Sequence, residues 1–330
     1  MKKIGFLICD VGNGHLTQAI TFYNILKNNN FIVPIVVSCG YQENLEYKKI
    51  FYDSNYDFEK FWIGEEETNN LSLLNKINLI RSILKKMDTE RIIKKYKLDM
   101  VISFWTPNLR TTFSVPCICI APQFLINNNF NLKIIIRNFQ NKQIPISVGE
   151  KNIYSPYWIP YLIDINPIKK IKTNKKIALA YAVSGIDFQK RLFKIAKNNP
   201  TFEIHFFFNT NPFINFPSNV IYHKTSRIEF KKYFVKAKCV LCTSGNELIQ
   251  ECIINKIPVA TINCSNKQYE QVENMKKYVY KLKYAEIMEN DLNLDLLSKK
   301  DLSISNKHFL KGLENREEKI IKLINSFLYL

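Results

Sequence analysis

Long apolar runs are missing from this sequence of 330 residues. No stretch reaches the ~18–20 consecutive apolar residues that a membrane-spanning helix needs. The N-terminus begins Met-Lys-Lys like a signal peptide, but Asp10 interrupts the apolar run after six residues. A signal peptide needs roughly 7–15 apolar residues at this point. We therefore expect a cytoplasmic protein.

Metal-ligand patterns are also scarce. Most of the eight cysteines stand among apolar or β-branched neighbours, which is typical of packed, reduced thiols in a chain without an export signal. One Cys-x-x-Cys pair occurs, Cys239 and Cys242, but no second pair or nearby histidine completes a tetrahedral zinc set. We expect no metal site.

Arginine is rare: the chain has 7 arginines against 40 lysines, together with 37 asparagines. The net charge of +18 predicts a polyanionic partner such as nucleic acid, anionic lipid or a phosphorylated substrate. However, few arginines are available for bidentate contacts to phosphate or guanine. The charge is also uneven, because residues 1–165 carry 19 − 14 = +5 and the remainder 28 − 15 = +13.

The first half of the chain alternates between predicted strands and helices. An apolar run over Lys3–Asp10 leads through the turn Val11-Gly12-Asn13-Gly14-His15 into a helix with Ala19, Phe22 and Leu26 on one face. Further strands are predicted at Phe31–Ser38, Asp99–Ser103 and Val115–Ile120, and a lysine-rich amphipathic helix over 73–95. This alternation predicts an α/β domain with a mostly parallel, doubly wound sheet.

Prolines interrupt the pattern over Tyr154–Lys176, where we place the domain junction. The pattern then restarts, with strands predicted at Ile177–Tyr181, Phe202–Phe208, Cys239–Cys242 and Val259–Ile262, and helices at Ile228–Ala237, Gly245–Asn255 and Ser305–Phe327. We predict two Rossmann-like domains, 1–165 and 166–330, that face a central ligand cleft. The terminal helix could pack back on the first domain.

The N-terminal glycine turn is not a complete dinucleotide fingerprint. Thr17 stands where a third small residue is needed, and Ser38 where an acid should end the second strand, which argues against a nicotinamide dehydrogenase. Gly12-Asn13-Gly14 still opens a helix whose first amides suit an anion. His15 is either a general base at the ligand or a cap of this helix, and the local sequence does not distinguish the two.

A second group of polar residues follows the strand that ends near Cys242. Ser244-Gly245 opens a helix whose amides and dipole suit a diphosphate. Glu251 follows on that helix at a spacing that suits ribose hydroxyls. Beyond Pro258, Glu270 and Gln271 offer a carboxylate and an amide to sugar hydroxyls, with Asn274 after them.

This arrangement resembles the two-domain GT-B glycosyltransferases, near the UDP-glycosyltransferases and the peptidoglycan N-acetylglucosaminyltransferase. The similarity covers the glycine turn, Asp99–Gln123 and above all Ser226–Asn274. It implies that His15 deprotonates the acceptor and that Gly245 meets phosphate. It further implies that Glu251 binds the ribose of a UDP-sugar, and that Glu270 and Gln271 read the donor sugar.

The sequence departs from that family at several positions. Glu247 and Leu248 replace small hydroxyl residues in the first turn of the donor helix, and Asn255-Lys256-Ile257 replaces the glycine before Pro258. Phe104-Trp105 stands where relatives often have an acid that supports the base. Asp10 is then the nearest carboxylate in sequence that could orient His15.

The resemblance implies an inverting, metal-independent hexosyltransferase that uses a UDP-sugar and no separate cofactor. A lipid or glycan of the cell envelope is the favoured acceptor. Lysines and Tyr157-Trp158 could contact the inner face of an anionic membrane peripherally. Three alternatives stay open. They are a DNA-base-modifying glucosyltransferase, a hydrolysing nucleotide-sugar 2-epimerase, and a non-catalytic binder of sugar nucleotides.

Overall fold

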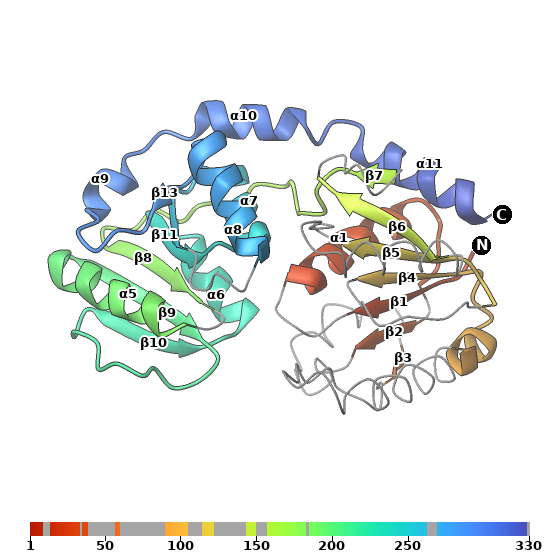
Figure 1. The fold of residues 1–330 in the computed structure, drawn as a ribbon, viewed down its shortest axis with the longest axis horizontal. Coiled ribbons are helices and arrows are strands. Elements are labelled where there is room, and N and C mark those ends of the chain that lie inside the picture. The colour runs from red at the N-terminus through yellow and green to blue at the C-terminus, as the bar shows by residue number, and fades with distance from the viewer. Residues whose placement is uncertain are drawn as a thin grey trace. The chain divides into compact units, whose positions relative to one another are not determined.

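The computed structural model describes most of the chain and divides it into two units. The described residues are 1–8, 14–33, 35–38, 57–59, 90–104, 114–121, 143–149, 157–182, 185–262 and 269–328. The first unit comprises Met1–Leu162 together with Asn315–Leu330, and the second comprises Ile163–Glu314. Each unit contains a parallel sheet (Figure 1).

The sheet of the first unit has the strand order β3-β2-β1-β4-β5-β6-β7, and its described pairings are parallel. β1 and β4 are buried along their whole length, as strands covered on both faces must be, and this explains their unbroken apolar sequences. The strands are β1 (Ile4–Ile8), β2 (Ile35–Ser38), β3 (Asp57–Glu59), β4 (Met100–Phe104), β5 (Cys117–Ala121), β6 (Gln143–Val148) and β7 (Tyr157–Ile159).

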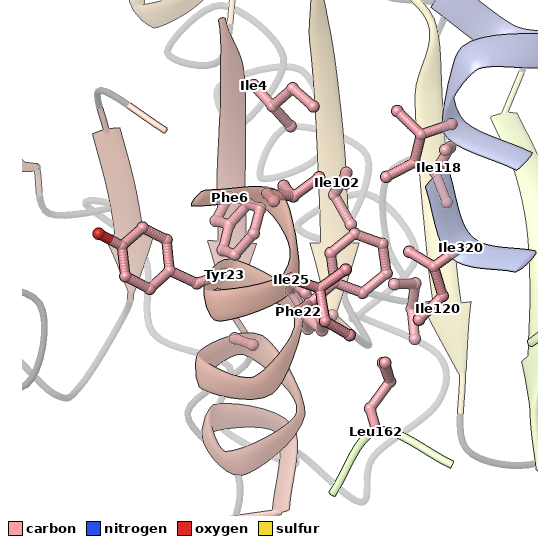
Figure 2. Close-up of a cluster of buried hydrophobic side chains, with 14 of the residues drawn as sticks. Ile4, Phe6, Phe22, Tyr23, Ile25, Ile102, Ile118, Ile120, Leu162 and Ile320 are labelled. Carbon is pink, nitrogen blue, oxygen red and sulfur yellow. The ribbon is translucent and has the colours of Figure 1, made fainter. Parts of the chain in front are cut away.

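Helix α1 (Gly14–Asn28) covers one face of this sheet. Its apolar residues recur at helical spacing, so Phe22 and Ile25 point toward Phe6 and Ile102 of the sheet (Figure 2). The rings of Phe6 and Phe104 lie 5.1 Å apart, edge to face, a geometry that aromatic pairs favour.

The C-terminal helix belongs to the first unit. α11 (Arg316–Leu328) inserts three buried side chains, Ile320, Ile324 and Phe327, into the core that α1 also covers. Its first residue, Arg316, donates from Nη1 to the carbonyl of Tyr161 at 3.2 Å. The last helix of the chain therefore completes a core that the first residues begin.

The sheet of the second unit has the order β10-β9-β8-β11-β12-β13, and its strands pair in parallel. Its strands are β8 (Lys176–Tyr181), β9 (Phe202–Phe208), β10 (Val220–Lys224), β11 (Cys239–Thr243), β12 (Val259–Ile262) and β13 (Glu286–Ile287). Its helices are α5 (Ile186–Asn198), α6 (Arg227–Phe234), α7 (Asn246–Ile254), α8 (Tyr269–Met275), α9 (Leu294–Ser298) and α10 (Ser303–Lys311), with a π-helical turn at Lys276–Lys281. Both sheets thus confirm the predicted doubly wound α/β fold.

The structure corrects two predictions of secondary structure. The single terminal helix predicted over Ser305–Phe327 is in fact α10 and α11, separated by a turn that contains Gly312 and Asn315. Asn315 has a φ of 57°, a left-handed conformation that interrupts a helix. β7 also forms inside the proline-rich junction, because Tyr157–Ile159 pairs with the edge of β6 before Pro160.

The five cysteines that the structure describes are free thiols. Cys239 and Cys242 are fully buried on β11, and Cys252 is buried on α7. Burial raises the pKa of the Cys239 thiol to about 12. These are packed thiols, as predicted, and no helix in the described part of the chain is long and apolar enough to span a membrane.

Candidate functional site

The two central strands of the second unit mark the candidate site. β8 and β11 are neighbours, and the chain continues from them toward opposite edges of the sheet. In open α/β sheets, ligands bind at the carboxyl ends of the strands where the strand order reverses. The turns that follow β8 and β11 are therefore the segments best placed to meet a ligand.

The turn after β11 joins the strand directly to α7. Ser244 is fully buried, and its amide donates to the carbonyl of Ile262 at 3.1 Å. Gly245 is the N-cap of α7, with φ −68° and ψ 136°, and no side chain caps the helix. The positive end of the helix dipole at this turn suits a phosphate group.

A buried polar network supports this turn from behind. Asn274 of α8 donates from Nδ2 to the carbonyl of Ser244 at 2.7 Å, and Thr261 of β12 donates to the Ser244 hydroxyl at 3.2 Å. Tyr278 and Gln250 both donate to Oδ1 of Asn246, at 2.5 Å and 2.7 Å. Because buried hydrogen bonds of this kind are costly to leave unmade, they hold the start of α7 in one position.

Asn274, predicted as a donor-binding residue, is therefore a member of this network. Its side chain is fully buried and contacts Ser244. Gln271 lies on the same helix, three residues earlier, and is partly exposed. Glu270 lies on α8 as well, but its side chain is outside the described residues.

Glu251 lies in the middle of α7, where its side chain is 24% exposed. Its Oε1 is 4.0 Å from Nη2 of Arg227, on the first turn of α6. Burial raises the pKa of the Glu251 carboxyl, whereas the charges of Arg227 and Lys231 lower it. The sequence predicted Glu251, but nothing in the local pattern indicated Arg227.

Gly14 and His15 form the first turn of α1 in the first unit. His15 is partly buried, and burial lowers its pKa from 6.5 to about 4. The imidazole is therefore neutral at physiological pH, which is the state that a general base requires. Asp10, the predicted partner of His15, lies outside the described residues, as does the glycine turn before Gly14.

A second turn, between β8 and α5, was not predicted from the sequence. Gly185 is the N-cap of α5, with a φ of 118° and no capping side chain; the two residues before it are not described. The signal was present, because Ser184-Gly185 stands between a strand and a helix just as Ser244-Gly245 does. In sequence, both serine-glycine pairs follow the strands at which the strand order reverses.

The described residues contain no group of three or more His, Cys, Asp or Glu side chains that could hold a metal ion. The described residues at the turn after β11 and along α7 offer helix amides, the carboxylate of Glu251 and the guanidinium of Arg227. Such a set binds a ligand that has both an anionic part and hydroxyl groups.

Comparisons with known proteins agree with this architecture. The glycotransferase of kitacinnamycin superposes on the structure with a TM-score of 0.68, at 12% identity over 99% of both chains. UGT89C1 from Arabidopsis thaliana gives 0.69, at 9% identity over 99% of both chains. MurG from Acinetobacter baumannii gives 0.56, at 12% identity over 99% of this chain and 100% of that one.

No family model matches the sequence, and no curated protein matches it either. The relationship is visible in the arrangement of strands and helices rather than in the residues. With each of these three proteins it extends over nearly the full length of the chain. The chain has the two-domain α/β fold of the GT-B glycosyltransferases.

Proposed function

We propose that the protein is a glycosyltransferase that moves a hexose from a UDP-sugar to an acceptor hydroxyl with inversion at the anomeric carbon. The observation that carries this proposal is the turn after β11. α7 begins at Gly245, which has no side chain to cap the helix amides, and carries the carboxylate of Glu251 further along. The helix follows one of the two strands at which the strand order reverses. The GT-B fold supports the same function.

The donor is arranged along α7. The diphosphate lies at the first-turn amides beside Gly245, and the ribose hydroxyls donate to Glu251. These residues are six positions apart, which corresponds to a rise of about 9 Å along the helix. Glu247, in the same first turn, carries a charge of the same sign as the diphosphate, so the proposal requires its carboxylate to point away. Glu270 and Gln271 contact the hexose.

The transfer step needs a base and a stabilised leaving group. Neutral His15 accepts the proton of the acceptor hydroxyl as its oxygen attacks the anomeric carbon. The bond from that carbon to the β-phosphate oxygen breaks, and UDP leaves with the electron pair. The amides at the start of α7 stabilise the charge that develops on the diphosphate. No separate cofactor takes part.

The acceptor is a lipid or glycan of the cell envelope in this proposal, and the protein contacts an anionic membrane peripherally. A stretch of the second unit supports the contact: Ile171 is 52% exposed between the exposed Lys170 and Lys172. Exposed apolar and cationic side chains together bind anionic lipid surfaces. Sedimentation with phosphatidylglycerol vesicles should retain the protein and should weaken for Ile171→Asp. Equal binding to neutral vesicles, or preference for duplex DNA, would contradict this partner.

Product analysis separates the proposed activity from its alternatives. The protein is incubated with UDP-glucose, UDP-N-acetylglucosamine and other UDP-hexoses, with and without a lipid extract. Release of UDP together with a glycosylated lipid or glycan supports the proposal. Free UDP with an epimerised free sugar and no acceptor indicates the hydrolysing epimerase, and binding without turnover indicates a non-catalytic binder.

Gly245→Ala tests the observation on which the proposal depends. Among the described residues, a Cβ at this position would meet no atom closer than the carbonyl oxygen of Thr243, at 3.9 Å, and the φ of −68° suits alanine. The variant should therefore fold with an unchanged melting temperature. It should bind UDP at least about tenfold more weakly, because the added methyl group keeps the phosphate away from the amides.

Isothermal titration calorimetry measures the affinity for UDP, and thermal melting of the free protein measures its stability. Unchanged UDP affinity in a normally folded Gly245→Ala protein would show that the diphosphate binds elsewhere.

A further inference from the structure

The starting observation is the separation between Arg227 and Glu251. Nη2 of the guanidinium and Oε1 of the carboxylate are 4.0 Å apart, which is too far for a direct hydrogen bond. A hydroxyl oxygen can, however, lie about 2.8 Å from both atoms at once. Both side chains are partly exposed, 18% for Arg227 and 24% for Glu251, so a ligand can reach them.

The backbone around Arg227 is fixed. Ser226 is the N-cap of α6, and its hydroxyl accepts a hydrogen bond from the amide of Glu229 at 3.1 Å. Arg227 is therefore the first residue of a capped helix. Glu251 lies on α7, whose first turn is held by the buried network around Asn246. The gap between the two side chains is set by two well-anchored helices.

The two cations of α6 oppose the effect of burial on Glu251, whose pKa is raised overall. Burial and the carboxylate of Asp164 raise its pKa, while Arg227 and Lys231 of α6 lower it. An ionised carboxylate accepts hydrogen bonds from hydroxyl groups, and a guanidinium donates to the oxygen of the same groups. A hydroxyl placed in the gap would therefore have both its hydrogen and a lone pair satisfied.

We propose that Arg227 and Glu251 together form a clamp for a ribose hydroxyl, in which Arg227 makes the site specific for ribonucleotides over 2′-deoxyribonucleotides. This inference rests on the proposed function, because it takes the nucleoside part of the donor as the ligand. Arg227 has two roles in the clamp. It donates to the hydroxyl oxygen, and its positive charge lowers the pKa of Glu251 against the effect of burial.

The two roles make separate predictions. Loss of the guanidinium donor reduces discrimination between UDP and 2′-deoxy-UDP. Loss of the positive charge raises the pKa of Glu251 further, so UDP binding declines at a higher pH as the medium is acidified. A purely structural arginine would change neither the ratio of the two affinities nor the pH at which binding is lost.

The test uses the full chain and three variants. Arg227→Met removes donor and charge, and Arg227→Lys keeps the charge but loses the planar pair of donors. Lys232→Met is the matched control, because Lys232 lies on the same helix but bonds to Glu229 and is 59% exposed. Affinities for UDP, GDP, ADP and their 2′-deoxy counterparts are measured by calorimetry between pH 5 and 8.

Wild type and Lys232→Met should bind UDP at least about tenfold more tightly than 2′-deoxy-UDP, the value of one hydrogen bond to a charged group. Arg227→Met should reduce this ratio to about threefold or less. It should also raise the pH at which UDP binding is lost on acidification. Arg227→Lys should lose discrimination but keep the wild-type pH limit. If Arg227→Met does not fold, the ratio of UDP affinity to 2′-deoxy-UDP affinity in Arg227→Lys tests the clamp by itself.

An unchanged ratio in folded Arg227 variants, with UDP still bound, overturns the clamp and leaves the proposed function standing. Failure of the wild-type protein to bind any of the ribonucleoside diphosphates overturns the proposed function and the clamp with it. If only GDP or ADP binds, the ratio of its affinity to that of its 2′-deoxy form tests the clamp in the same way.

Discussion

Burial works against the charged form of both ionisable residues on which the proposed chemistry depends. For His15 the lowered pKa of about 4 keeps the imidazole neutral, the state that accepts a proton, but it also makes the ring a weaker base. For Glu251 burial is a cost, because the proposed contact with ribose needs the carboxylate. The nearby charges of Arg227 and Lys231 oppose the rise of its pKa. Each residue therefore depends on what surrounds it as much as on its own chemistry.

His15→Gln should lower acceptor-dependent transfer by about 10²–10⁴-fold, the usual contribution of a positioned base, without changing UDP affinity. In the wild type, transfer should be constant above about pH 5 and fall as the pH approaches the histidine pKa of about 4, because protonation removes the acceptor lone pair. Initial rates of UDP release with saturating donor, measured across pH 4 to 8, give the loss of transfer in His15→Gln and the pH dependence of the wild type.

The same pKa makes a prediction about stability. An unfolded histidine has a pKa of about 6.5, so between pH 6.5 and 4 the unfolded chain binds a proton that the folded protein does not. The free energy of unfolding of the wild type should therefore decrease as pH falls through this window, and less so for His15→Gln. Near-normal transfer by His15→Gln would reject the base assignment.

At the scale of secondary-structure elements, the end of β6 is tightly constrained. Gly149 follows this strand with a φ of 89°, and its amide donates to the carbonyl of Ile159 in β7 at 2.7 Å. A Cβ here would lie 1.9 Å from the ring of Tyr161. The contact between the end of β6 and the segment after β7 therefore requires glycine.

Gly149→Ala should destabilise the protein by about 2–4 kcal/mol, since it combines a left-handed backbone with steric overlap in a packed region. Gly245→Ala is the matched control, because its backbone and surroundings accept a methyl group. Urea denaturation of both variants measures the difference. If Gly149→Ala were as stable as the wild type, the close packing against Tyr161 would be wrong.

The elements that could be predicted from the sequence are those with a long apolar pattern. Phe202–Phe208 and Val259–Ile262 form strands with the predicted bounds. Six of the seven residues of the first strand and all four of the second are buried, and such short runs of buried residues leave a distinct signal. β13, with two residues, leaves none, since its pairing with β12 depends on tertiary contacts. β7 was hidden by the prolines around it, and the break between α10 and α11 depends on backbone conformation at Asn315.

The residues of the candidate site also separate into those that the sequence could indicate and those that it could not. Gly245 and Glu251 could be predicted because they lie on one helix, where spacing in sequence gives spacing in the structure. Arg227 is 24 residues before Glu251, and only the adjacent positions of α6 and α7 bring the two together. The donor contact predicted for Asn274 stays a prediction; its hydrogen bond to Ser244 depends on how α8 packs behind the turn, which the sequence pattern does not indicate.

At the scale of the whole molecule, the two units have separate cores and the chain crosses between them twice, after Leu162 and after Glu314. The three tryptophans, Trp62, Trp105 and Trp158, all lie in the sequence of the first unit. Their fluorescence therefore reports on the first unit, while the thermal stabilisation that UDP should produce originates in the second.

Ile320→Ala should destabilise the first unit by about 2–4 kcal/mol, because Ile320 is completely buried beside Ile118 and Ile120 (Figure 2) and leaves a cavity when truncated. Tryptophan fluorescence during urea unfolding should show the loss. UDP affinity, measured without denaturant, should be unchanged. Lys322→Ala, at an exposed position of the same helix, is the control and should shift stability by less than about 0.5 kcal/mol. Equal effects of the two substitutions would mean that α11 is not part of this core.

The position of α11 also governs the order in which the protein can fold during synthesis. The second unit is one continuous stretch, Ile163–Glu314, so all its residues are synthesised before α11. The first unit is begun first, yet it lacks Ile320, Ile324 and Phe327 until α11 has left the ribosome. Nascent chains stalled before residue 315 should therefore hold a sheet with an exposed apolar face, a natural binding site for a chaperone, even though most of that unit has long been translated.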